Sequence, residues 1–134
     1  MMLSGFGVKQ QAKSPISIST AKSAYSLGET VKMSVKYTNI SSEAISTYYP
    51  SGQKFEFIVK DENRKEVWRW SRGKMFIMSI QPFELEPGKS VSYSYSWRQK
   101  DNEGKFVPAG KYYLTGEISI APRVRSQEKA FTVK

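Results

Sequence analysis

The side chains that most often perform enzymatic chemistry are missing from this sequence. It contains no cysteine and no histidine, which excludes disulfides, thiolate nucleophiles, the usual zinc ligands and every Ser-His triad. A carboxylate-only or serine–lysine enzyme remains conceivable, but the commonest general base is absent. We therefore expect a protein that is not an enzyme, has no cofactor, metal or small-molecule substrate, and works by recognition.

Residues 51–76 carry the richest set of side chains for recognition. They hold two of the three tryptophans and three of the seven phenylalanines of the chain. The stretch ends in a segment without clear periodicity that combines two cations, a flexible glycine and two large apolar side chains: Ser71, Arg72, Gly73, Lys74, Met75 and Phe76.

The residues just before that segment have the pattern of a β-hairpin. Residues 55–60 alternate with period two, as expected of a strand with one buried face, and a second short strand carries Trp68 and Trp70. Each aromatic side chain can bury about 200 Å², so the indoles need the same cover as the phenylalanines. We expect Val59 to pair with Trp68 and Phe57 with Trp70, because cross-strand partners share a face.

This register predicts the length of the hairpin loop. It requires an even number of loop residues, which favours a four-residue loop at residues 62–65. The common three-residue loop prefers glycine at its left-handed position, and this sequence has Arg64 there.

Alternating patterns recur along the rest of the chain, with turn residues every eight to twelve positions. Strands are expected at residues 15–21, 30–38, 44–49, 77–86, 90–97, 111–120 and 129–134. No convincing helix is present. Eight or nine short strands predict an all-β protein, an antiparallel β-sandwich of the immunoglobulin type with Greek-key connections. Without a disulfide, its core must depend on aromatic packing.

The length of 134 residues suits one domain that needs no covalent staples. We expect this single domain at residues 15–134 and a flexible N-terminal tail at residues 1–14. The tail is a poor signal peptide, because no basic residue precedes its short apolar part. No run approaches the length of a transmembrane helix, and we expect no membrane partner.

The net charge of +9 suits an acidic partner. The basic residues are scattered without a long run, so we expect no nucleic-acid partner. The charge is better explained by solubility and by the steering of a protein partner.

Several motifs resemble the BsuPI family of bacterial intracellular proteinase inhibitors. The specific part lies in residues 51–55 and 68–76, above all the run Trp-Ser-Arg-Gly-Lys-Met-Phe, and weaker matches follow at residues 85–88, 95–97, 101–104 and 107–112. The resemblance spans residues 31–116. It implies a cytoplasmic inhibitor of a subtilisin-like serine protease, but it assigns no reactive residue.

Two residues depart from the family's pattern. Arg64 stands where a turn glycine is usual, and Arg98 stands where aspartate commonly follows the tryptophan. Both positions are expected in loops, so the two departures do not affect the predicted fold. They put in doubt only a contact that either loop makes in the family.

On that resemblance we predict that Ser71 to Phe76 face the protease. Six extended residues reach about 20 Å, enough to cross a cleft and to pair with it through main-chain hydrogen bonds. Met75 or Phe76 would suit a cleft that favours large apolar side chains. In the alternative, Met75 and Phe76 plug the end of the sandwich while Arg72 and Lys74 decorate a turn.

Three other features have a functional and a structural interpretation. Tyr48 and Tyr49 form a second candidate contact patch if they are exposed, or a packed rim if they are not. Residues 101–104 contain part of a calcium-loop pattern but lack the later ligands, which favours a turn. The three tryptophans could stack on sugars, but alternation directs them inward to the core.

Two classes of function follow. The first is a binding protein that occupies the cleft of a protease. The second is an immunoglobulin-like structural or adhesive accessory domain of a surface or envelope assembly.

Overall fold

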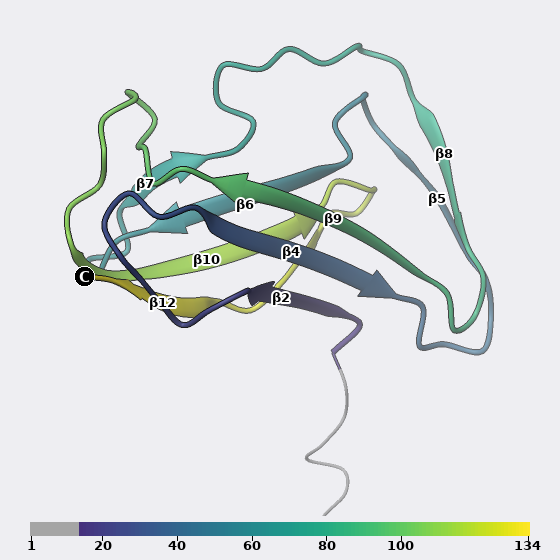
Figure 1. Cartoon of the computed structure of the whole chain (residues 1–134). Helices are drawn as coiled ribbons and strands as arrows, with labels where there is room; N and C mark the ends of the chain where they lie inside the picture. The colour runs from purple at the N-terminus through teal and green to yellow at the C-terminus, as the bar shows by residue number, and fades with distance from the viewer. Residues whose placement is uncertain (1–13) are drawn as a thin grey trace, which may run out of the picture.

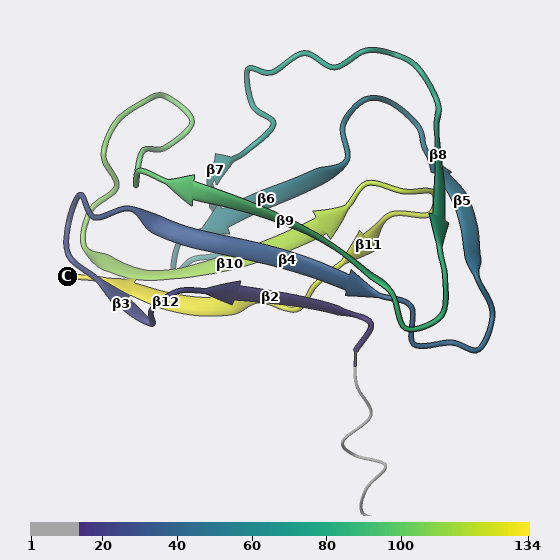
Figure 2. The same ribbon diagram turned by 45° about the vertical axis from the view of Figure 1, so that its right-hand side comes forward.

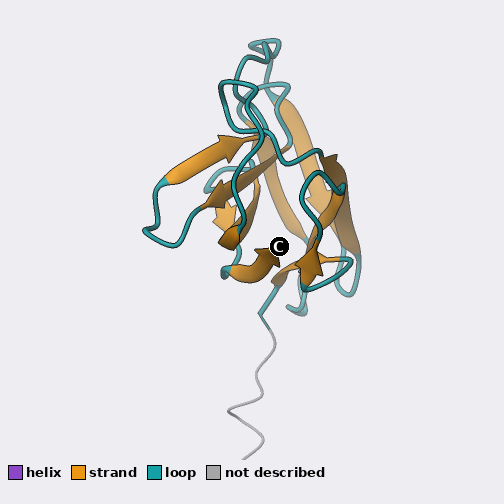
Figure 3. Cartoon of the chain, turned by 60° about the vertical axis from the view of Figure 1, so that its left-hand side comes forward, coloured by secondary structure: helices purple, strands orange, loops and turns teal. Residues whose placement is uncertain are grey.

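Strands make up all the regular structure in the computed structural model, which describes residues 14–134 (Figure 3). The predicted tail therefore lies outside the described residues except for Ser14. The larger sheet has the order β3 (Ala24–Tyr25), β12 (Lys129–Val133), β10 (Gly110–Ile118), β6 (Phe55–Lys60) and β7 (Glu66–Arg69), with β11 (Val124–Arg125) paired to β10. The other sheets are β2 (Ile16–Thr20), β4 (Val31–Thr38) and β9 (Ser90–Trp97), and the pair β5 (Ile45–Tyr49) and β8 (Gln81–Leu85).

The two larger sheets lie over each other, and the β5–β8 pair stands across one end (Figures 1 and 2). Every strand pair is antiparallel except β3 with β12, which is parallel. The predicted all-β sandwich is confirmed. The described residues form eleven strands rather than eight or nine, because β3 and β11 are too short to show alternation. The immunoglobulin type and the Greek-key connections stay predictions.

The core lies between the two larger sheets. The alternation of β4 holds as predicted: Val31, Met33, Val35 and Tyr37 are buried, and the lysines between them are exposed. The sheets approach each other closely at Gly116 of β10, where a Cβ atom would lie 2.8 Å from side-chain atoms of both Ile18 and Val35. Only glycine fits this position without moving one sheet.

Aromatic side chains fill the core, as expected for a chain without disulfides. Trp97 is 2% exposed and packs edge-on against Phe131, with ring centroids 6.2 Å apart. The inward prediction is therefore right for Trp97. Trp68 and Trp70 are half-buried and pack against the core. Trp68 stacks on Tyr95, with ring centroids 5.6 Å apart.

The hairpin of β6 and β7 has the predicted register but not the predicted loop. Val59 pairs with Trp68, and the Trp70 N–H donates to the Phe57 carbonyl at 2.9 Å. However, Asp61 and Lys65 are joined by a backbone hydrogen bond of 2.9 Å around a three-residue loop, and a bulge in β7 restores the even offset. The prediction of a four-residue loop at residues 62–65 was therefore wrong.

Arg64 explains why the three-residue loop forms without glycine. It adopts the left-handed conformation with φ 64°, and its guanidinium lies 3.7 Å from the centroid of the Tyr113 ring. Arg64 also forms an ion pair of 3.4 Å with Glu128. These contacts offset the strain of a left-handed side-chain residue, which is about 1 kcal/mol.

Both faces of β6 are buried, whereas the sequence pattern predicted that only one face would be. Glu56 and Ile58 are 2% and 4% exposed, and Glu56 pairs directly with the fully buried Glu117 of β10. Arg69 approaches Glu56 at 3.4 Å, and Arg125 approaches Glu117 at 2.7 Å. The arginines thus allow two carboxylates to be buried side by side, because a buried charge requires a charged or hydrogen-bonded partner.

Candidate functional site

The predicted contact segment lies in the connection from β7 to β8, which runs along the top of the molecule in Figure 1. We call residues 71–80 the β7–β8 loop. It begins with two successive turns, in which Arg72 N donates to Arg69 O and Lys74 N to Ser71 O, both at 3.0 Å. Residues 74–80 have no regular structure.

A buried carboxylate holds the start of this loop. Glu56 Oε1 accepts a hydrogen bond of 3.0 Å from the Ser71 backbone N–H, and Glu56 Oε2 accepts one from the Ser71 hydroxyl. Gln53 and Arg69 also donate to the same carboxylate, at 3.2 and 3.4 Å. Because hydrogen bonds to a buried charge are strong, the first residue of the loop is firmly attached to β6.

The indole of Trp70 organises the next part of the loop. One neighbour is Phe55 of β6, with ring centroids 4.1 Å apart. From the loop, Phe76 lies 5.8 Å from the indole and the Lys74 ammonium lies 4.9 Å from it. Residues 74 and 76 therefore both contact Trp70, while Met75 between them is 97% exposed.

A second attachment holds the middle of the loop. The Gly52 N–H donates to the Ile77 carbonyl at 2.8 Å. A Cβ atom on residue 52 would lie 2.8 Å from Ile77 Cγ1 and 3.3 Å from Ile77 N. The approach of the loop to the β5–β6 connection thus requires glycine at this position.

The exposed surface of the β7–β8 loop is strongly apolar. Its most exposed large side chains are Met75 at 97%, Met78 at 90%, Ile80 at 68% and Ile77 at 66%. Four of the nine exposed large hydrophobic side chains of the described chain thus lie within six positions. Arg72 and Lys74 are its only charged residues. Such clustering is typical of surfaces that contact a partner.

The structure separates the predicted contact residues into two groups. Arg72, Gly73, Lys74 and Met75 are exposed, whereas Ser71 and Phe76 are half-buried. The alternative in which both apolar residues plug the sandwich is wrong for Met75, and Phe76 is half-buried beside Trp70. Whether these residues contact a protease stays a prediction.

The sequence analysis missed Ile77, Met78 and Ile80, which it assigned to an extended segment. The available clue was a cluster of apolar residues between Gly73 and Pro82 that lacks the period of a strand. Only residues 81–85 form β8, and Pro82 is tolerated there because β8 has one partner strand, β5.

The second candidate patch is exposed at only one of its two tyrosines. Tyr48 is 43% exposed and pairs with Pro82, two residues after the end of the β7–β8 loop. Tyr49 is 5% exposed, contacts Phe83 edge-on at 5.4 Å and shares a hydrogen bond of 2.9 Å with the Tyr93 hydroxyl. Burial, together with that hydrogen bond, raises the pKa of Tyr49. For Tyr49, the alternative of a packed position is therefore the one that the structure shows.

Residues 101–105 form a turn, as expected. Asp101 Oδ1 accepts hydrogen bonds of 2.9 Å from the N–H groups of Glu103 and Lys105, and Gly104 has φ 84°. These N–H groups, that of Lys105 foremost, lower the pKa of Asp101. Within residues 14–134, no group of three or more acidic side chains is placed to hold a metal ion.

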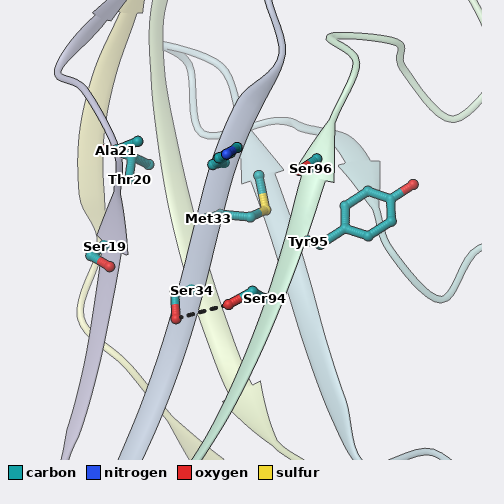
Figure 4. Close-up of a pocket in the computed structure, with 9 residues that line it drawn as sticks. Ser19, Thr20, Ala21, Met33, Ser34, Ser94, Tyr95 and Ser96 are labelled. Carbon is teal, nitrogen blue, oxygen red and sulfur yellow. Dashed lines mark hydrogen bonds between the residues drawn. The ribbon is translucent and has the colours of Figure 1, made fainter.

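A shallow hollow of about 410 Å³ lies on the outer face of β2, β4 and β9. Figure 4 shows its short serine side chains, with Ser94 donating to Ser34 at 3.3 Å, and the Tyr95 ring pointing away from them. Lys32 and Tyr95 are the only titratable residues in its lining. The hollow therefore offers no acid–base pair, and the β7–β8 loop is the stronger candidate site.

Comparison with known families gives one match that covers most of the chain. The profile of the BsuPI family, described as intracellular proteinase inhibitor, matches residues 18–123. No curated protein matches. Among residues 14–134, no helix has the length and apolar character needed to cross a membrane.

Solved structures resemble the chain at low sequence identity. The sporulation control protein Spo0M from Bacillus subtilis has a TM-score of 0.52 and 12% identity, over 89% of this chain and 48% of that one. The alkylpurine DNA glycosylase AlkC from Pseudomonas fluorescens has a TM-score of 0.51 and 9% identity, over 90% and 30%. A β-glucosidase from Erythrobacter marinus has 0.49 and 14%, over 89% and 15%.

These similarities describe the fold alone. The chain spans 15% of the Erythrobacter β-glucosidase and less than half of Spo0M. Fold similarity at this level of identity carries no information on activity.

Proposed function

Because the chain belongs to the BsuPI family of intracellular proteinase inhibitors, we propose that it inhibits a subtilisin-like serine protease in the cytoplasm by binding with its β7–β8 loop in the protease cleft. The supporting observation is that the β7–β8 loop exposes an apolar side chain while the residues on either side of it are held against the sandwich. Met75 projects fully into solvent, while both of its sequence neighbours contact Trp70.

Attachment of the loop reduces the cost of binding. An extended segment that pairs with a cleft loses conformational entropy unless its shape exists beforehand. Here Glu56 holds Ser71, Trp70 holds residues 74 and 76, and Gly52 holds Ile77. The loop therefore enters the cleft with much of its order already present.

The charge of the loop indicates the kind of surface that surrounds the cleft. Arg72 and Lys74 are exposed, and no acidic residue lies between Ser71 and Ile80. A cleft with an acidic rim attracts such a loop and accelerates association. We expect the alanine substitution of both cations to lower the association rate constant and to weaken its dependence on salt.

Tyr48 is a second contact residue in this proposal. It is exposed on β5, beside the start of β8, and a tyrosine at the edge of an interface can bind through both its ring and its hydroxyl. Tyr49 supports the site from inside the sandwich.

The test is titration of the purified protein against a subtilisin-like protease with a chromogenic substrate. We expect stoichiometric loss of activity and no cleavage of the inhibitor during the assay. An interface of standard size should bind more tightly than about micromolar. Full protease activity at that inhibitor concentration would therefore contradict the proposal and favour the function as an accessory domain.

A pair of variants tests the role of the loop. Met75→Ala should weaken inhibition about tenfold, because a central apolar contact is worth more than 1 kcal/mol. Phe106→Ala is the matched control, since Phe106 is 63% exposed in a different loop. Equal inhibition by wild type and Met75→Ala would contradict the assignment of the loop.

A further inference from the structure

The described methionines differ sharply in their access to solvent. Met75 and Met78 are 97% and 90% exposed at the tip of the β7–β8 loop, whereas Met33 is 2% exposed in the core. All three carry the same thioether, so only their surroundings differ. Methionine oxidation depends on access of the oxidant to sulfur.

The two exposed methionines also lie where a change in polarity has consequences. Ile77 and Ile80 are exposed beside them, so the tip offers four apolar side chains to a partner. Conversion of a thioether to a sulfoxide places a strong dipole and a hydrogen-bond acceptor on this surface. An apolar cleft leaves that acceptor without a donor.

We propose that Met75 and Met78 form a reversible oxidation site through which hydroperoxides weaken the binding of the loop to its protease. This inference rests on the proposed function. In the forward step the sulfur loses two electrons and takes the terminal oxygen of the hydroperoxide, whose O–O bond breaks, and the remainder leaves as an alcohol or water. In the reverse step a dithiol supplies two electrons and two protons, the oxygen leaves as water, and the dithiol becomes a disulfide.

The fold tolerates this modification. The attachments of the loop are made by Ser71, Lys74, Phe76 and the Ile77 carbonyl, and none uses either methionine sulfur. Oxidation therefore changes the surface that a partner meets and leaves the loop attached to the sandwich. Oxidation of Met33, in contrast, would place a polar group in the core.

The first experiment measures selectivity and needs no protease. The folded full-length protein is treated with dilute hydrogen peroxide, digested and analysed by mass spectrometry at successive times. We expect Met75 and Met78 to oxidise at least about tenfold faster than Met33, and the difference to vanish in denaturant, because access to sulfur controls the rate. Equal rates in the folded protein would overturn the proposal.

The second experiment measures the consequence for binding. Each protein is compared with itself before and after peroxide, by titration against the protease. For the wild type we expect the inhibition constant to rise about 10- to 100-fold, as for the burial of an unpaired polar group. Treatment with a dithiol and both methionine sulfoxide reductases, one for each sulfoxide epimer, should restore it. In Met75→Leu with Met78→Leu, we expect peroxide to have no effect.

The outcomes separate this inference from the proposed function. If untreated wild type does not inhibit the protease, the proposed function fails, and the regulatory role of the two methionines fails with it. The selectivity of oxidation is measured without a protease, so its result is independent of that failure. If untreated wild type inhibits but oxidised wild type inhibits equally, only this inference is overturned. A loss of inhibition that the reductases do not reverse would show that residues other than methionine were damaged. A loss that also occurs in the double leucine variant would show that Met75 and Met78 are not responsible. Either result overturns this inference.

Discussion

Two long connections of this sandwich have opposite characters. The β7–β8 loop ends in four exposed apolar side chains. The β9–β10 loop, residues 98–109, is held to the rest of the fold by hydrogen bonds of Gln99, Asn102 and Pro108. In Figure 1 it rises beside β7 as the light green segment. Its most buried residue is Gln99, which is fully buried and bonds to the backbone of Ser26, Gly28 and Glu29.

The β9–β10 loop also closes the edge of the larger sheet. The Asn102 N–H donates to the Val67 carbonyl, and the Asn102 side-chain oxygen accepts from the Arg69 N–H, both at 2.9 Å. Asn102 thereby occupies groups of β7 that another chain could otherwise pair with. One loop protects the edge of the fold, while the other leaves apolar side chains exposed, where we propose that a partner binds. Substitutions in the first should affect stability, and those in the second should affect binding.

The largest expected effect is on stability, from Gln99→Ala. The substitution leaves three backbone groups without their partner in a buried site and should lower the free energy of unfolding by about 3 kcal/mol. Urea denaturation measures this, with Gln127→Ala at an exposed position as control. Inhibition by the folded fraction should not change. A loss below about 1 kcal/mol would break the comparison.

The reverse effect is expected from Met75→Asp combined with Met78→Asp. Two charges in an apolar contact should weaken inhibition about 100-fold, while the free energy of unfolding changes by less than about 0.5 kcal/mol, because both side chains are exposed. Protease titration and urea denaturation of the same sample measure the two quantities. An equal loss of inhibition in Phe106→Asp, from the β9–β10 loop, would remove the distinction between the loops.

A smaller effect is expected from a methyl group at the base of the β7–β8 loop. In Gly52→Ala the new atom meets Ile77 at 2.8 Å, so the loop must shift, and inhibition should weaken about tenfold with a stability loss near 1 kcal/mol. Gly104→Ala is the matched control. Its Cβ meets nothing within 4 Å, but its φ of 84° is unfavourable, so it should cost about 1 kcal/mol of stability without weakening inhibition. Identical behaviour of the two variants would contradict this expectation.

The smallest effect is a pH dependence at the β9–β10 loop and its contact with β7. The side-chain hydrogen bond from Arg69 lowers the pKa of Glu66, to which Asn102 also donates, and the backbone N–H of Lys105 lowers the pKa of Asp101. A carboxylate whose pKa is lower in the folded state contributes stability above its unfolded pKa, near 4, and loses it as the pH falls further. The β7–β8 loop contains no carboxylate.

Urea denaturation at about pH 6 and about pH 3 checks this expectation. The protein with Glu66→Gln and Asp101→Asn should lose less stability on acidification than the wild type. An unchanged dependence on pH would show that these two groups do not contribute.

Much of the fold was predictable because strands with one buried face have period two. The alternation in β4 and the cross-strand position of Trp68 were evident from the order of residues alone, whereas Tyr95 of β9, expected inward, is exposed. The loop of the β6–β7 hairpin was not, because its left-handed residue is stabilised by Tyr113 and Glu128, which are distant in the sequence. The burial of Glu56 was equally hidden, since it depends on Arg69 and on Ser71 beyond the hairpin.

The candidate site was predictable only in outline. The motif at residues 68–76 located the segment, but it did not distinguish exposed Met75 from half-buried Phe76, because adjacent residues in an irregular segment have no fixed sides. Likewise, Tyr48 and Tyr49 look equivalent in the sequence, and the pleat of β5 turns them to opposite faces.

The order of residues by itself determined the all-β class, the hairpin register, the lack of thiol and imidazole chemistry, and the family. These properties depend on residue type and local period. Tertiary structure alone decided which apolar side chains remain outside the core. That outcome depends on how much surface the packed sheets can cover, and the sheets cover Phe76 through Trp70 but leave Met75 and Met78 in water.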